Sequence, residues 1–204
     1  MISVIIADDH AVVRTGLAAL LETEGDIEVV GLAQDGIEAV ALAARHKPDV
    51  AIIDLQMPRM NGIAATAEIA KSSPGTRVVV LTTFSSSDDI SAALEAGAVG
   101  AFMKTATETE LIAAVREVAA GRRLVQQDVS RLLKSDPPAP RLTDRQLRIL
   151  ELMTAGLTNQ DIARQIGITP SGVNQHILNL LGKLGAANRT EAAAIAVRKG
   201  LVKP

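Results

Sequence analysis

Five polar side chains within the first 104 residues each stand at the end of a short apolar run: Asp8, Asp9, Asp54, Thr82 and Lys104. Carboxylates are the hard oxygen ligands that Mg²⁺ prefers in proteins. A lysine ammonium and a hydroxyl can bind the oxygens of a phosphoryl group and stabilise its charge during transfer. If these side chains meet in space, they predict a magnesium-assisted site in which Asp54 is the nucleophile that accepts a phosphoryl group.

Each of these residues also has an ordinary structural interpretation. An Asp pair after a strand commonly caps a helix, a lone Thr is a good strand former, and a lone Lys is usually a solvated charge. Asp54 is harder to explain in this way, because it directly follows Ile52 and Ile53 and an unpaired buried carboxylate is costly. The combination therefore favours one shared site over five independent structural roles.

The elements that would position these residues alternate along residues 1–121. Apolar runs predict strands at residues 2–7, 27–33, 50–54, 77–82 and 99–104, and amphipathic runs predict helices at residues 12–22, 36–46, 63–71, 88–96 and 108–120. Five strand–helix units in succession predict an α/β fold with a doubly wound, five-stranded parallel sheet. The carboxyl ends of its strands share one edge, where such sheets bind their ligands, so we expect the polar residues together there.

Residues 122–140 are expected to form a linker to a second, all-helical domain at residues 141–204. The linker ends in Pro137, Pro138 and Pro140, and prolines favour an extended spacer over a helix. Four helices are predicted after it, at residues 144–155, 159–166, 170–184 and 189–200, with Thr158 and Thr169 as N-caps of the second and third. Only residues 167–169 separate these two, which predicts a helix-turn-helix.

Composition and charge narrow the functional classes. The absence of cysteine excludes disulfides and thiolate metal sites. The N-terminus lacks a basic leader and no apolar run is long enough for a membrane span, so we expect a cytoplasmic protein without a membrane partner. Residues 1–140 hold 12 Lys and Arg against 19 Asp and Glu, whereas residues 141–204 hold 9 against 4. The basic excess of the second domain is compatible with a polyanionic partner.

The segments IIADDH, AIIDLQMPRMNG, VVLTT and GAFMKT resemble the signature segments of response-regulator receiver domains, and the resemblance covers residues 2–119. It implies phosphorylation of Asp54 by a sensor histidine kinase with Mg²⁺ as cofactor. It also implies that Asp9, Asp54 and the backbone carbonyl of Gln56 hold the Mg²⁺, with Asp8 acting mainly through water.

The same resemblance assigns switch residues. Thr82 and Lys104 would contact the acyl phosphate, and Phe102 matches the aromatic residue that family members rotate inward on activation. An ordinary core role for Phe102 remains the alternative. The family often has a proline after the lysine, preceded by a cis peptide bond, whereas this chain has Thr105, so the geometry of that bond stays open.

Residues 141–201 resemble the LuxR-type DNA-binding domain of the NarL/FixJ subfamily, which implies sequence-specific binding to double-stranded promoter DNA. Because one such module buries little surface, we expect a homodimer after phosphorylation, with two recognition helices that read paired sites. The candidate DNA-contact residues are Asn159, Ser171, Asn174, Gln175, Leu178, Lys183 and Arg189.

The second domain departs from its family at several positions. The family usually has Thr-Val-Lys where this chain has Gly172, Val173 and Asn174, and it often has Arg in place of Gly182 and Glu in place of Gln146. Loss of a phosphate-contacting lysine weakens DNA binding, and each helical glycine costs about 1 kcal/mol. Asn174 can still pair with adenine in the major groove.

These observations favour a two-component response regulator whose phosphorylation controls DNA binding and transcription, with no independent turnover of a substrate. One alternative is a phospho-switched interaction protein whose output domain binds DNA weakly or not at all. A second is a phosphatase that uses Asp54 as nucleophile. That chemistry usually needs another carboxylate two residues later, where this chain has Gln56.

Overall fold

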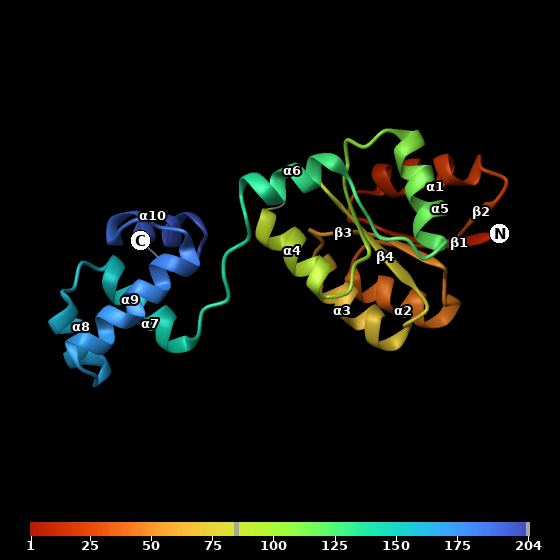
Figure 1. Ribbon diagram of the computed structural model, residues 1–204. Coiled ribbons are helices and arrows are strands. Elements are labelled where there is room, and N and C mark those ends of the chain that lie inside the picture. The colour runs from red at the N-terminus through yellow and green to blue at the C-terminus, as the bar shows by residue number, and fades with distance from the viewer. Residues whose placement is uncertain (84–85, 203–204) are drawn as a thin grey trace. The chain divides into compact units, whose positions relative to one another are not determined.

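The computed structural model describes residues 1–83 and 86–202, and the chain divides into two compact units, Met1–Pro138 and Ala139–Pro204 (Figure 1). Within the described residues, the first unit contains one parallel sheet with the strand order β2-β1-β3-β4-β5-β6. Its strands are β1 (Ile2–Ala7), β2 (Ile27–Ala33), β3 (Val50–Asp54), β4 (Arg77–Thr82), β5 (Gly100–Met103) and β6 (Leu124–Val125). The α/β fold predicted from the sequence is confirmed.

Helices cover both faces of this sheet (Figure 1). They are α1 (Ala11–Glu22), α2 (Gly36–His46), α3 (Gly62–Ser72), α4 (Ser87–Glu95), α5 (Glu108–Ala119) and α6 (Gln127–Ser135). Buried residues of α1 and α5 pack on one face, and those of α2, α3, α4 and α6 pack on the other. The sheet is therefore covered on both sides, as a parallel sheet requires.

Strand β3 shows why its sequence is a continuous apolar run. All of its residues are buried. Val50 and Ile52 contribute to the core beneath α1 and α5, whereas Ala51 and Ile53 contribute to the core on the opposite face. Because both faces of the strand are covered, neither set of alternating positions can be polar until the strand ends at Asp54.

Residues 122–140 differ from the predicted linker, because they include β6 and α6, which belong to the first unit. Strand β6 pairs with β5 and makes the sheet six-stranded rather than five-stranded. In α6, Val129 is fully buried, and Leu132 and Leu133 pack against the same core. Their i, i+3, i+4 spacing is a helical signal, but it is short and lies among charged residues beside a proline-rich segment.

Within its described residues, the second unit consists of four helices: α7 (Asp144–Thr154), α8 (Asn159–Ile166), α9 (Pro170–Leu184) and α10 (Arg189–Arg198). Thr158 and Thr169 cap α8 and α9 through their side chains, as predicted. Gly167 ends α8 in the left-handed conformation, with φ of 69°, and the chain turns there into α9. Among the described helices of the chain, none combines the length and apolar character needed to cross a membrane.

Candidate functional site

The carboxyl ends of β1, β3 and β5 bring three charged side chains into direct contact. Lys104 Nζ lies 2.5 Å from Asp8 Oδ2 and 2.9 Å from Asp54 Oδ2. Asp8 is 1% exposed and Asp54 is 5% exposed. Residues that are far apart in the sequence thus form one buried charged cluster, because parallel strands end at the same edge of the sheet.

Burial and mutual contact set the charge state of this cluster. Desolvation raises the pKa of Asp54, with a further contribution from Asp8, whereas Lys104 and a backbone hydrogen bond from Gln56 act in the opposite direction. Desolvation also opposes the charged form of Lys104, but its hydrogen bonds to Asp8 and Asp54 outweigh this effect and raise the pKa of Lys104. Lys104 is therefore held as an ammonium group between two carboxyl groups.

Asp9 and His10 add further donor atoms at the rim of the cluster. Ligand atoms of Asp8, Asp9, His10 and Asp54 all lie within 4.8 Å of one another. Three carboxylates around so small a volume fit a hard divalent cation with oxygen ligands, as Mg²⁺ is. His10 Nδ1 lies 2.7 Å from Asp9 Oδ1. His10 is not among the site residues predicted from the sequence. Its position directly after Asp9 could have indicated that it lies at the site.

Of the predicted switch residues, Lys104 belongs to the cluster, Thr82 contacts its backbone, and Phe102 lies in the core. Thr82 ends β4 and is fully buried, and its carbonyl accepts a hydrogen bond from the backbone N–H of Lys104 at 2.7 Å. Phe102 is buried in the core beneath α5, so in this conformation it is a core residue, and its rotation stays a prediction. The peptide bond between Lys104 and Thr105 is trans.

The loop after β3 returns closely onto the Asp54 backbone. A Cβ atom at Gly62 would lie 2.2 Å from the carbonyl oxygen of Asp54, so only glycine permits this approach. The N–H of Gly62 donates to the carbonyl of Leu55 at 3.0 Å and closes the loop at its base. Gln56 is exposed within this loop, and its backbone contacts the Asp54 carboxyl group.

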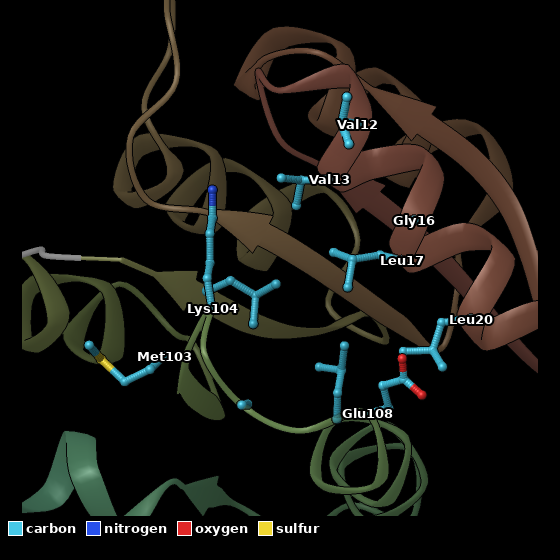
Figure 2. Close-up of a pocket in the computed structure, with 11 residues that line it drawn as sticks. Val12, Val13, Gly16, Leu17, Leu20, Met103, Lys104 and Glu108 are labelled. Atoms are coloured by element: carbon cyan, nitrogen blue, oxygen red, sulfur yellow. The ribbon is translucent and has the colours of Figure 1, made fainter.

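An apolar groove opens beside the cluster, between α1 and the segment that joins β5 to α5 (Figure 2). Its cavity has a volume of about 300 Å³. Val13 and Leu17 line it from α1, and Met103, Lys104 and Glu108 line it from the other side (Figure 2). The groove and the charged cluster thus share Lys104.

In the second unit, one face of α9 presents polar and apolar side chains to solvent. Ser171, Asn174, Gln175 and Leu178 are all exposed, and Leu178 is 53% exposed. Val173 and Ile177 on the opposite face are buried in the core. The exposed face of α9 therefore contains four of the residues predicted to contact DNA.

Comparison with known proteins matches both units. Residues 4–116 match the family described as response regulator receiver domain, and residues 140–196 match bacterial regulatory proteins of the luxR family. The chain is 41% identical over 210 residues to the transcriptional regulatory protein LiaR of Bacillus subtilis, which covers 99% of this chain and 100% of LiaR. This chain is a two-component response regulator of the NarL/FixJ subfamily.

Solved structures of other response regulators resemble this one along nearly its whole length. The crystal structure of ChrA, from a heme-sensing two-component system, is 37% identical with a TM-score of 0.59 and covers 98% of each chain. The RcsB–DNA complex is 26% identical with a TM-score of 0.68 and covers 97% of this chain and 98% of RcsB. The present response regulator is thus a phosphorylation-controlled transcription regulator with a receiver and a LuxR-type helix-turn-helix.

In this response regulator, Lys183 is hydrogen-bonded within the second unit. Its ammonium group donates to the carbonyl of Arg141 and to Oε1 of Gln146, each at 3.0 Å. Gln146 is mostly buried and is also part of the capping box of α7. Lys183 therefore joins the end of α9 to the start of α7, and its predicted contact with DNA stays a prediction.

Arg189 and Asn159, both predicted DNA contacts, bind each other. An Arg189 guanidinium nitrogen lies 3.0 Å from Asn159 Oδ1, and the same side chain donates to the carbonyls of Met153 and Leu157. Burial lowers the pKa of Arg189. These bonds attach the start of α10 to the segment between α7 and α8, a role that only the tertiary structure reveals.

No close contact within the second unit requires glycine at position 172 or 182 of α9. A Cβ atom at Gly182 would meet no atom within 4 Å, and one at Gly172 would be in ordinary contact with Thr169 Oγ1 at 3.4 Å and Ile168 Cδ1 at 3.5 Å. The unit has room for a side chain at either position.

Proposed function

We propose that Asp54 accepts a phosphoryl group from a sensor histidine kinase, and that this modification controls binding of the second unit to double-stranded promoter DNA. The observation that carries the proposal is the contact of Lys104 with both Asp8 and Asp54 at one edge of the sheet. A nucleophilic carboxylate, a neighbouring cation and a cluster of oxygen donors are the groups that phosphoryl transfer requires.

In the proposed transfer, an Asp54 carboxylate oxygen forms a bond to phosphorus while the bond from phosphorus to the donor's imidazole nitrogen breaks. The bonding electrons stay with the imidazole. Lys104 neutralises charge on the phosphoryl oxygens, and the hydroxyl of Thr82 donates a hydrogen bond to one of them. A Mg²⁺ ion held by Asp8, Asp9, Asp54 and the Gln56 carbonyl would supply further charge neutralisation.

The groove beside Lys104 gives the donor a surface to contact. A protein that brings a phosphohistidine to Asp54 must approach the rim that Lys104 shares with the groove. Val13 and Leu17 offer apolar area there. We propose that this face of α1 contacts the kinase during transfer.

For the output, we propose that α9 enters the major groove with its exposed face. Asn174 and Gln175 can pair with adenine, and Leu178 can contact a thymine methyl group. We further propose that the phosphorylated protein acts in the cytoplasm as a homodimer, because two modules add both affinity and spacing specificity. No independent turnover of a substrate is expected, since the residue two positions after Asp54 is Gln56 and not a carboxylate.

A mobility-shift experiment tests this proposal. The protein is incubated with acetyl phosphate and Mg²⁺, its phosphorylation is measured by mass spectrometry, and binding to fragments selected from genomic DNA is measured. Phosphorylation is expected to raise DNA affinity, and Asp54→Asn is expected to abolish both the added phosphate and the increase. An increase that persists in Asp54→Asn would contradict phospho-control through this residue.

The alternative interaction module is favoured by the hydrogen bonds that Lys183 and Arg189, two predicted DNA contacts, make within the second unit. The same experiment decides between the two functions. Failure of the phosphorylated protein to shift any DNA at low salt supports the interaction module, whereas sequence-selective binding excludes it.

A further inference from the structure

The loop that follows Asp54 is attached on its far side to the start of α2. The guanidinium of Arg59 forms an ion pair with Oδ2 of Asp35 and lies 3.1 Å from Oε1 of Glu38. Asp35 is fully buried, and its other carboxylate oxygen accepts the backbone N–H of Glu38 at 3.0 Å and caps α2. A buried carboxylate requires a charged partner, and Arg59 supplies it.

A backbone contact reinforces this attachment. The N–H of Gly36 donates to the carbonyl of Met60 at 3.1 Å. A Cβ atom at position 36 would lie 2.6 Å from that carbonyl oxygen, so glycine permits the close approach. The loop is thus held to α2 by the two ion pairs of Arg59, with Asp35 and Glu38, and by one backbone hydrogen bond of the next residue, Met60.

The backbone of Arg59 is in the left-handed region, with φ of 63°. A residue with a Cβ atom adopts this conformation at a cost in free energy, and glycine would avoid it. Glycine would also remove the guanidinium from Asp35. Arg59 therefore occupies a position where the backbone favours glycine and the side chain makes the contact with a buried charge.

We propose that Arg59 is a positioning residue for the magnesium site: its ion pair with Asp35 holds the loop so that the backbone carbonyl of Gln56 faces a cation bound at Asp54. Only Met57 and Pro58 separate Gln56 from Arg59, and the fixed φ of proline limits how independently the two can move. The base of the loop is already closed by the hydrogen bond between Gly62 and Leu55. The inference rests on the proposed function of the Asp54 site.

The test measures Mg²⁺ binding to the full-length protein by isothermal titration calorimetry, with magnesium chloride and no phosphodonor. Arg59→Gln, which keeps much of the side-chain length but no charge, is expected to raise the Kd for Mg²⁺ about tenfold, because residues that orient metal ligands affect affinity on this scale. Arg59→Lys, which keeps the charge, is expected to restore part of the affinity.

A second measurement separates positioning from a general loss of structure. The rate of phosphorylation by acetyl phosphate is followed at increasing Mg²⁺ concentration. Arg59→Gln is expected to shift the half-maximal Mg²⁺ concentration upward by the same factor as the Kd and to leave the plateau rate unchanged. A lower plateau with an unshifted midpoint would overturn the proposal.

Two control variants sharpen the result. Arg59→Gln combined with Asp35→Asn removes the unpaired buried charge while Asn still caps α2, so it is expected to recover thermal stability but not Mg²⁺ affinity. Arg116→Gln breaks a different ion pair of the same unit, with Asp26 and Glu24, and is expected to leave Mg²⁺ affinity unchanged.

The outcomes distinguish this inference from the proposed function. If the wild-type protein binds Mg²⁺ and Arg59→Gln binds it equally well, only the positioning role is wrong. Recovery of both stability and Mg²⁺ affinity in the double variant also overturns it. If the wild-type protein binds no Mg²⁺ and takes up no phosphate, the proposed function of the Asp54 site fails, and the inference fails with it.

Discussion

At the scale of single residues, Lys104 occupies the position between Asp8 and Asp54 where positive charge is needed. Lys104→Gln leaves two buried carboxyl groups close together without a cation. Breaking a buried pair in this way is expected to lower the free energy of unfolding by about 3 kcal/mol in the absence of divalent cations. Urea denaturation with and without Mg²⁺ measures the effect, and added Mg²⁺ is expected to recover part of the loss.

Lys71 provides the matched control for this prediction. Its ammonium group pairs with Glu68 on an exposed helix surface, where the lysine side chain is 72% exposed. Lys71→Gln is expected to change stability by less than about 1 kcal/mol, with no dependence on Mg²⁺. An equal effect of Mg²⁺ on the two variants would contradict the role given to Lys104.

At the scale of elements, α6 is the segment in which the structure differs most from the prediction, which placed these residues in a linker. Val129 is fully buried against the sheet, so Val129→Ala removes two buried methyl groups and leaves a cavity. We expect a loss of about 2 kcal/mol in the stability of the first unit. If this segment were instead a free linker, Val129→Ala would not change the stability of the first unit. Lys134→Ala, at an exposed position of the same helix, serves as the control in thermal denaturation.

The end of α9 offers a second prediction at this scale. Gly182 has open space around it, so Gly182→Ala is expected to stabilise the helix by about 1 kcal/mol. Gly182→Arg should give a comparable stabilisation and also add a phosphate contact, which steepens the salt dependence of DNA affinity by about one ion. Fluorescence anisotropy at several salt concentrations separates the two variants. Equal salt slopes would show that position 182 does not face the DNA backbone.

At the scale of the whole molecule, each unit has its own buried core. We therefore expect two unfolding transitions in differential scanning calorimetry. Val129→Ala should lower only the transition temperature of the first unit. Leu180→Ala truncates a fully buried side chain of α9 and should lower only the transition temperature of the second unit. A single transition that both variants shift equally would contradict independent unfolding.

Much of the first unit follows from local patterns. Continuous apolar runs indicate strands that are covered on both faces, and β1 to β5 lie where those runs predict them. The convergence of Asp8, Asp54 and Lys104 follows from topology alone, since each ends a parallel strand. Strand β6 could not be predicted in the same way, because two residues are too few to show alternation and their pairing with β5 is a long-range contact.

The order of the elements and the meeting of polar residues at the strand ends can be predicted from the amino-acid sequence, because periodicity is a local property of the chain. The partners of several charged side chains, by contrast, become visible only in the folded protein. The Arg59–Asp35 pair, the bonds of Arg189 to Asn159 and those of Lys183 to Gln146 each join residues that no local pattern connects. Hydrogen bonds and ion pairs of this kind depend on distances between elements, and those distances are set when the cores pack.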